Sequence, residues 1–201
     1  PTARLAENLG PLPEGVTLTI WDLKTPPPAG RLDIVVPPYM GGTSALSALE
    51  GVDVGLVQGQ SIGYDGVAQK LPAGIPFANA ASVHETSTAE LAVALILAAQ
   101  RQLPRFVLAQ ERGEWSPVFA TSLADRGVLL VGFGGVGTAI ARRLAPFEVE
   151  LSAVARTART ERVDGVGDVT VHAVDELPAL LAGAELVVLS PPGGAATAPL
   201  F

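Results

Sequence analysis

The feature that most constrains the fold of this chain is a glycine-rich turn between a strand-like run and a helix-like stretch. The segment GFGGVG at residues 132–137 has the spacing Gly-x-Gly-x-x-Gly. A continuous apolar run at 128–132 leads into it, an alanine-rich stretch follows it, and a second strand-like run comes at 149–155. This order predicts a dinucleotide-binding βαβ unit. Because 22 of the 201 residues are glycine, the spacing by itself would also fit a turn that binds no ligand.

Each glycine of the segment has a distinct physical role in such a unit. Gly132 allows the tight turn, Gly134 lets the backbone approach a pyrophosphate, and Gly137 lets the helix pack closely on the strand. The unpaired N–H groups at the helix start, near Gly135 and Val136, would face the negative oxygens of the ligand. We therefore predict that these five residues bind a dinucleotide.

The residues after the second strand predict which dinucleotide is bound. An NAD site usually carries Asp or Glu about 20 residues after the glycines, where it accepts a hydrogen bond from the ribose 2′-OH. This chain has Arg156-Thr157-Ala158-Arg159 there, without a carboxylate. Two guanidinium groups and a hydroxyl suit a 2′-phosphate, so NADP(H) is predicted, with NAD(H) as second choice. The alternative is a solvated loop with two ordinary arginines.

Short apolar runs alternate with helix-like stretches along the whole chain. Strands are predicted at residues 16–21, 32–38, 52–58, 128–132, 149–155 and 185–192, and the strand at 32–38 is expected to be buried. Three of the intervening helices are expected to end at Gly10, Gly51 and Gly183, since glycine commonly follows the last helical residue. The alternation predicts an α/β protein with mostly parallel sheets.

A longer helix is predicted in the middle of the chain. Ser87 and Glu90 have the spacing of a capping box at a helix start, and the stretch that follows is apolar nearly all round up to about Arg101. We expect this helix to be buried. A second helix and an irregular loop are expected within 104–122, with a domain change there or just before.

Composition and charge exclude several classes of protein. The chain has no cysteine, which excludes disulfides and thiolate sites and fits a reducing compartment, so we expect it to be cytoplasmic. A net charge of −7 argues against broad nucleic-acid binding. The longest uncharged apolar run has nine residues, against about 18 for a membrane span. The aspartates show no ligand spacing, so we expect no metal.

Four motifs in order give the chain a resemblance to a known family. It resembles the D-isomer-specific 2-hydroxyacid dehydrogenases, which include glyoxylate/hydroxypyruvate reductases and phosphoglycerate dehydrogenase. The resemblance lies in VQGQSIGYDGV, NAASVHETSTAELAVALILA, RGVLLVGFGGVGTAIARRL and ELVVLSPPGGAAT. It implies a flavodoxin-like substrate domain over residues 1–100 and a Rossmann-type dinucleotide-binding domain, incomplete in this chain, over 104–201.

The resemblance also implies an activity and residue roles. A hydride would pass between NADP(H) and a small 2-oxo or 2-hydroxy acid. The backbone N–H groups of Ile62 and Gly63 would bind the substrate carboxylate, as consecutive amides in a turn can. The adenosine side of the cofactor would be lined by Ser190, Pro191 and Pro192, and Thr197 would begin the next helix.

The segment around Trp115 resembles an arm that packs across a partner subunit in this family. The resemblance therefore implies a homodimer. The alternative is that Trp115 is a lone anchoring aromatic residue of its own loop.

The family's catalytic Arg, Glu and His correspond to positions beyond Phe201, so no catalytic residue is expected here. His84 is interpreted as a loop or capping residue and His172 as structural. The chain is then either a piece of a longer enzyme or a non-catalytic NAD(P)-binding or regulatory protein. More distant relatives, such as adenosylhomocysteinase or alanine dehydrogenase, are disfavoured by the short N-terminal domain and by STAELAV.

Overall fold

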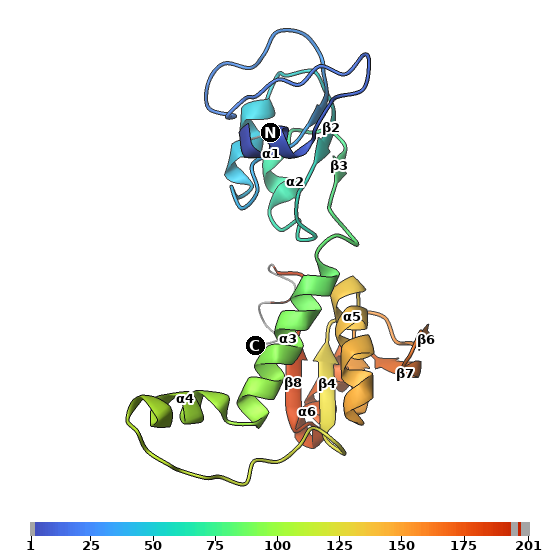
Figure 1. Cartoon of the computed structure of the whole chain (residues 1–201). Coiled ribbons are helices and arrows are strands. Elements are labelled where there is room, and N and C mark those ends of the chain that lie inside the picture. Colours follow the sequence, from blue (N-terminus) through green and yellow to red (C-terminus); the bar gives the residue numbers. More distant parts are fainter. Residues whose placement is uncertain (1–2, 194–196, 198–201) are drawn as a thin grey trace. The chain divides into compact units, whose positions relative to one another are not determined.

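The computed structural model describes residues 3–193 and residue 197. The chain divides into two compact units, one formed by Pro1–Val83 with Gly193–Phe201 and the other by His84–Pro192. Figure 1 labels their helices and strands. The α/β class with parallel sheets is confirmed in both units.

The first unit is built on a small parallel sheet with the strand order β1-β2-β3. Its core is apolar, and the side chains of Leu49 and Val57 are fully buried. The elements of this unit are α1 (Ala3–Asn8), β1 (Leu32–Val35), the 3-10 helix η1 (Ser44–Leu49), β2 (Val54–Gln58), α2 (Val67–Lys70) and β3 (Phe77–Ala78).

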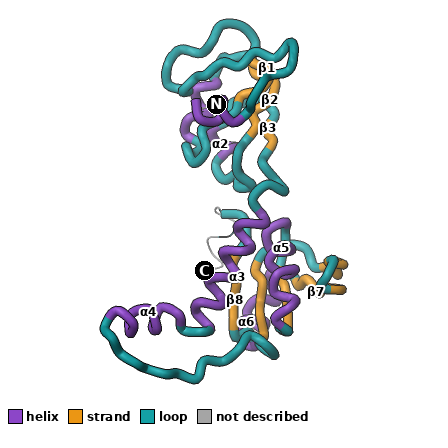
Figure 2. Tube along the Cα trace, in the orientation of Figure 1, coloured by secondary structure: helices purple, strands orange, loops and turns teal. Residues whose placement is uncertain are grey.

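Two expectations for the first unit are wrong. The predicted strand at 16–21 is irregular, and a long loop joins α1 to β1 (Figure 2). A strand needs a neighbour for its backbone hydrogen bonds. Among the described strands β1 pairs only with β2, so segment 16–21 does not pair with the free edge of β1. For the same reason β1 is an edge strand, so Ile34 is exposed rather than buried.

A tight turn directly follows the irregular segment. A carboxylate oxygen of Asp22 accepts hydrogen bonds from the backbone N–H of Thr25 and Lys24, at 2.8 and 2.9 Å. These two bonds, with Thr25 contributing most, lower the pKa of Asp22 to about 2. Asp22 therefore stays ionised and keeps the turn closed well below neutral pH.

The second unit holds a five-stranded sheet with the order β6-β7-β5-β4-β8. All neighbouring strands are parallel except β6 and β7. Its elements are α3 (Glu85–Gln100), α4 (Leu103–Glu111), β4 (Gly127–Val131), α5 (Gly135–Leu144), η2 (Ala145–Phe147), β5 (Glu150–Val154), β6 (Arg159–Val163), β7 (Gly167–His172), η3 (Val174–Glu176), α6 (Leu177–Gly183) and β8 (Leu186–Leu189).

The direction of the crossovers explains how this sheet is covered. Helix α5 joins β4 to β5, and α6 leads from β7 to β8 in the opposite direction along the sheet. Right-handed crossovers therefore place α5 and α6 on opposite faces. Strand β4 lies between β5 and β8, so Val128, Leu129 and Leu130 are buried. This is the first half of a dinucleotide-binding fold, as predicted.

Helix α3 departs from expectation in three ways. It begins at Glu85 rather than at Ser87, whose hydroxyl donates instead to the carbonyl of His84, so there is no capping box. It packs beside α5 (Figure 1), which places it in the second unit rather than in a domain ending near residue 100. One face is buried through Ala89 and Val93, but the other exposes Leu91 and Leu95 to 60% and 61%.

Among the described helices, none alone is long and apolar enough to cross a membrane. Helices α3 and α4 pass such a test only when they are taken together, and they are bent by 65° at the break between them.

Candidate cofactor-binding site

The glycine turn joins the carboxyl end of β4 to the start of α5, and sterics fix its first and last glycines. Gly132 has a φ of +100°, and a Cβ built on it would lie 2.6 Å from the carbonyl carbon of Ser190. A Cβ on Gly137 would lie 2.2 Å from the carbonyl oxygen of Gly132. Neither position has room for a side chain, in agreement with the tight turn and the close packing that the sequence predicts.

The middle of the turn faces open space. Gly134 is extended, with φ −104° and ψ −157°, and no heavy atom lies within 4 Å of its Cβ position. The N–H groups of Gly135 and Val136 belong to the first turn of α5 and have no acceptor within the helix. An open backbone next to free amides at a helix N-terminus fits a diphosphate, so these residues suit the predicted cofactor.

Two hydrogen bonds and one buried side chain hold the turn in place. Gly132 donates its N–H to the carbonyl of Val154 at 2.8 Å. The hydroxyl of Ser190 donates to the carbonyl of Gly132 at 3.0 Å. The side chain of Phe133 is buried in the core of the second unit. The structure therefore gives Ser190 a contact within the protein, while its predicted place beside the adenosine, with Pro191 and Pro192, stays a prediction.

Arg159 reaches back to the glycine turn. Its Nη2 donates to the carbonyl of Phe133 at 2.7 Å, and it pairs with the carboxylate of Glu161 at 2.6 Å. Arg159 begins strand β6 rather than lying in a loop. Neither β6 nor the partner Glu161 is predicted from the sequence above. The spacing of two residues, which places side chains on one face of a strand, is the signal that could have found them.

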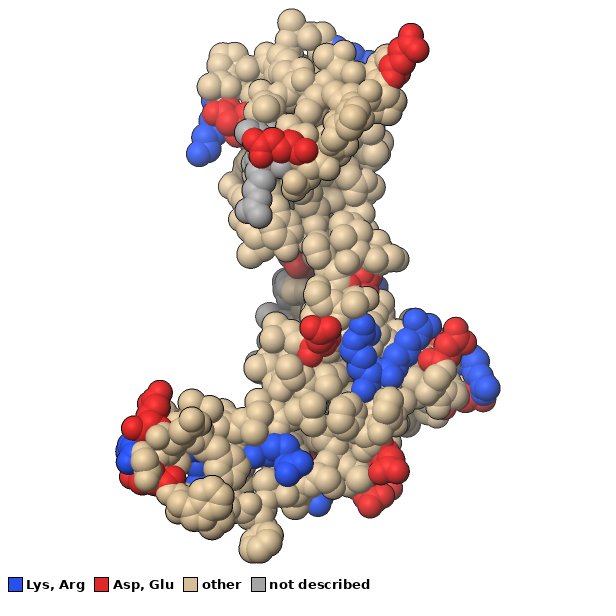
Figure 3. All heavy atoms as spheres, in the orientation of Figure 1, with Lys and Arg blue, Asp and Glu red and all other residues tan. Residues whose placement is uncertain are grey.

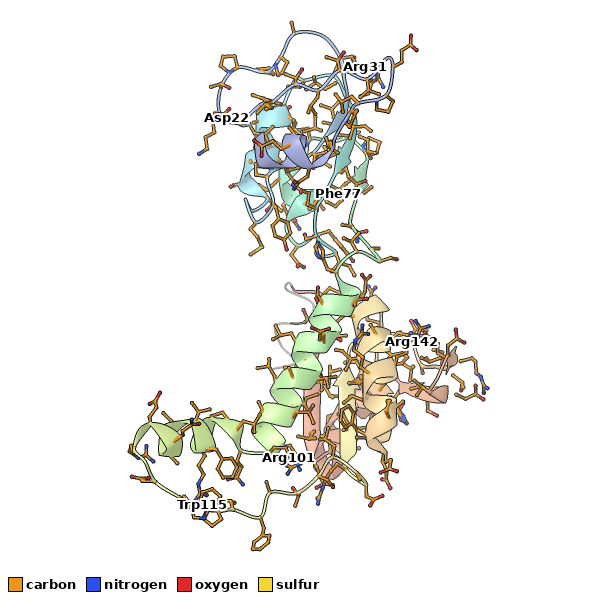
Figure 4. The ribbon with its side chains drawn as sticks, viewed as in Figure 1. Asp22, Arg31, Phe77, Arg101, Trp115 and Arg142 are labelled. Atoms are coloured by element: carbon orange, nitrogen blue, oxygen red, sulfur yellow. The ribbon has the colours of Figure 1, made fainter. Side chains whose placement is uncertain are left out.

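The other two residues of the predicted 2′-phosphate site lie in the turn between β5 and β6. Arg156 and Thr157 are both exposed. Within the described part of the chain, the side chain of Arg156 makes no hydrogen bond or ion pair, so its guanidinium is available to a ligand. Basic side chains also gather over α5 in the face drawn in Figure 3, and Figure 4 labels Arg142 on that helix. Arg142 and Arg143 belong to the last turn of α5, which is the end of the helix away from the glycine turn.

A carboxylate lies beside the first residue of α5. A Cβ on Gly135 would lie 2.8 Å from Oε1 of Glu85 and 3.1 Å from its Cγ. The other carboxylate oxygen, Oε2, is buried. The sequence does not reveal this contact, since 50 residues separate the two positions.

The predicted substrate-binding residues lie in the first unit, in the loop after β2. The side-chain amide of Asn79 donates to the carbonyl of Ile62 at 2.9 Å, and the hydroxyl of Ser61 donates to the carbonyl of Gly63 at 3.1 Å. The N–H groups of Ile62 and Gly63 donate no hydrogen bond within the described residues. Fixed carbonyls with open amides are the arrangement that an anion-binding turn needs.

The two histidines have separate surroundings. His84 occupies the position before α3, where its side chain does not cap the helix. His172 ends β7, and its Nδ1 lies 2.9 Å from Oε2 of Glu176. That hydrogen bond, followed by one from the N–H of Ala173, lowers the pKa of Glu176. The bond stabilises the fold above the carboxyl group's unfolded pKa and is lost as the pH falls through the lowered value.

No metal centre is found in the residues described. Among them, no group of three or more His, Cys, Asp or Glu side chains could hold a metal ion. Of the C-terminal residues named above, Thr197 lies in a turn, and the helix expected to follow it lies outside the described residues.

The chain is similar to a described protein family and to several known proteins. Residues 93–201, more than half of the chain, match the family described as D-isomer specific 2-hydroxyacid dehydrogenase, NAD binding domain. A human glyoxylate reductase/hydroxypyruvate reductase is 32% identical over 145 residues, which are 65% of this chain and 44% of the relative. A D-3-phosphoglycerate dehydrogenase from Archaeoglobus fulgidus is 31% identical over 121 residues, or 59% of this chain and 22% of the relative.

A solved structure agrees with these matches. An NADPH-dependent glyoxylate/hydroxypyruvate reductase from Sinorhizobium meliloti, in complex with NADP and malonate, superposes with a TM-score of 0.64 at 28% identity. The match covers 82% of this chain and 51% of that one. The chain thus spans about half the length of this enzyme, and less than half of the two curated relatives.

Proposed function

The chain belongs to the D-isomer-specific 2-hydroxyacid dehydrogenase family, and we propose that it binds NADP(H) for hydride transfer to and from a small 2-oxo or 2-hydroxy acid. The observation that carries the proposal is the glycine turn after β4. Its open middle glycine, the free amides of α5 and the Arg159 guanidinium on the carbonyl of Phe133 converge at one place. When bound, the nicotinamide ring supplies the hydride or accepts it.

The proposed cofactor contacts divide between two ends of the site. The amides of Gly135 and Val136 bind the diphosphate at the positive end of the α5 dipole. The guanidinium groups of Arg156 and Arg159, with the hydroxyl of Thr157, bind the 2′-phosphate. The NADP bound to the Sinorhizobium enzyme supports this choice for the present chain.

The substrate is proposed to be a small 2-oxo or 2-hydroxy acid such as glyoxylate or hydroxypyruvate. Support comes from the names of the human and Sinorhizobium relatives and from the open amides of Ile62 and Gly63. These amides bind the substrate carboxylate without a charged side chain. We assign no residue of this chain to the transfer of the proton that accompanies the hydride.

Cofactor binding is testable by isothermal titration of the chain with NADPH and with NADH at one ionic strength. We expect NADPH to bind about tenfold more tightly or better, which corresponds to about 1.4 kcal/mol or more. Equal affinity for both would contradict the proposed 2′-phosphate site. Tighter binding of NADH would replace NADP(H) with NAD(H) in the proposal.

We also propose that the chain forms a homodimer through α4 and the loop 112–122, here called the arm. Trp115 is 93% exposed and Phe119 is fully exposed, and Figure 4 shows Trp115 on the loop that follows α4. The loop is nevertheless tethered, because Arg105 donates to Ser116 at 3.1 Å and Gln100 donates to Thr121 at 2.7 Å. Large aromatic side chains on a held loop are typical anchors of protein interfaces.

The dimer is tested by replacing both aromatic residues of the arm. We expect the double variant Trp115→Ser/Phe119→Ser to sediment as a monomer at concentrations where the unaltered chain is a dimer, because the aromatic anchors of the interface are lost. Met40→Ser in the first unit is the control, since Met40 is 86% exposed and outside the arm. An unaltered chain that is monomeric throughout, or a double variant that still dimerises equally well, would contradict the proposal.

A further inference from the structure

We propose that Glu85 is an internal anion at the start of α5, which has to give way when the cofactor diphosphate binds and thereby weakens cofactor affinity. This inference rests on the proposed function, because it concerns the same diphosphate site. It adds a residue of α3 that weakens cofactor binding, whereas the amides of α5 and the arginines after β5 are proposed to strengthen it.

The geometry places the carboxylate where a side chain of residue 135 would otherwise lie. Oε1 of Glu85 is 2.8 Å from the Cβ position of Gly135, and Cγ and Cδ follow at 3.1 and 3.4 Å. Gly135 is the first residue of α5, and its N–H is one of the amides proposed to bind the diphosphate. The carboxylate and the diphosphate therefore meet at the same helix end.

Electrostatics gives the direction of the effect. A helix N-terminus carries a partial positive charge, which favours one negative group beside it. A second anion brought to the same place is repelled by the first. Binding of the diphosphate is thus opposed by the Glu85 charge. The glutamine side chain has nearly the same shape but no charge, so Glu85→Gln removes the repulsion and keeps the packing.

The main test is a titration of NADPH into three forms of the chain. We expect Glu85→Gln to bind NADPH about fivefold more tightly than the unaltered chain at low ionic strength, in line with the strength of one charge at a helix end. The difference should shrink at high salt, because ions screen the repulsion. Glu150→Gln is the matched control, since it makes the same charge change at the exposed amino end of β5, whereas the turn follows the carboxyl end of β4.

The outcomes separate this inference from the function on which it rests. Tighter binding by Glu85→Gln alone, with the expected salt dependence, supports the inference. If the unaltered chain binds NADPH and Glu85→Gln binds it with equal or lower affinity, the inference is overturned and the proposed function stands. If neither the unaltered chain nor either variant binds NADPH, both are overturned.

A second measurement tests the contact without any cofactor. Gly135→Ala should raise the melting temperature less than alanine at a helical position usually does, because its Cβ meets the Glu85 carboxylate at 2.8 Å and that side chain has to shift. In the background Glu85→Ala the same change should raise the melting temperature more, since the colliding oxygen is gone. Equal effects of Gly135→Ala in both backgrounds would show that the two side-chain positions are not coupled, and would overturn the geometry of the proposal.

Discussion

Gly137→Ala is expected to abolish measurable NADPH binding and to destabilise the second unit by about 3 kcal/mol, the upper part of the usual range for overpacking. The added Cβ would lie 2.2 Å from the carbonyl oxygen of Gly132. Neither atom belongs to a flexible side chain, so α5 has to move away from β4. The movement carries the amides of Gly135 and Val136 out of position. Urea unfolding and NADPH titration measure the two effects.

The matched control for this change is Gly183→Ala in the same unit. Gly183 ends α6, and no heavy atom lies within 4 Å of its Cβ position. Alanine at a helical position without a clash is neutral or slightly stabilising. If Gly137→Ala unfolds at the same urea concentration as Gly183→Ala and still binds NADPH, the close contact between α5 and the turn is not a constraint on the site.

Arg159→Ala is expected to weaken NADPH binding by about tenfold to a hundredfold, as the loss of a charge-assisted hydrogen bond predicts, and to leave NADH affinity nearly unchanged. NADH has no 2′-phosphate, so it does not need this guanidinium. The ratio of the two affinities is therefore the informative quantity. It separates recognition of the 2′-phosphate from support of the turn through the carbonyl of Phe133.

Arg162→Ala provides the control for that experiment. Arg162 lies on the same strand, and it pairs with Asp168 at 3.1 Å in an exposed position. Its loss removes the same charge without touching the turn. A parallel fall in affinity for both cofactors in Arg159→Ala would mean that Arg159 supports the turn only. NADP(H) selectivity would then rest on Arg156 and Thr157.

The parts of the site that follow local steric rules were predictable from the sequence. Gly132 and Gly137 have roles that depend on the backbone conformation and on one neighbouring strand, and the spacing of the motif specifies both. The strand runs at residues 128–132 and 149–155 are mostly apolar, and β4 and β5 match them to within one residue at each end. The family resemblance is confirmed over residues 93–201.

The parts that depend on distant neighbours were not predictable. The run at 16–21 has the alternation of a strand, but no described strand pairs with it. The apolar stretch of α3 indicated burial on all sides, whereas only the face towards α5 is covered and Leu91 remains exposed. The contact between Glu85 and Gly135 joins two helices far apart in sequence, and no periodicity reports it.

A crystal structure of the chain with NADPH tests the central claim most directly. We expect diphosphate oxygens within about 2.7–3.2 Å of the backbone nitrogens of Gly135 and Val136, as hydrogen bonds require. We also expect the 2′-phosphate against the guanidinium groups of Arg156 and Arg159. A cofactor bound elsewhere, or a turn closed by protein side chains when NADPH is in excess, would contradict the claim.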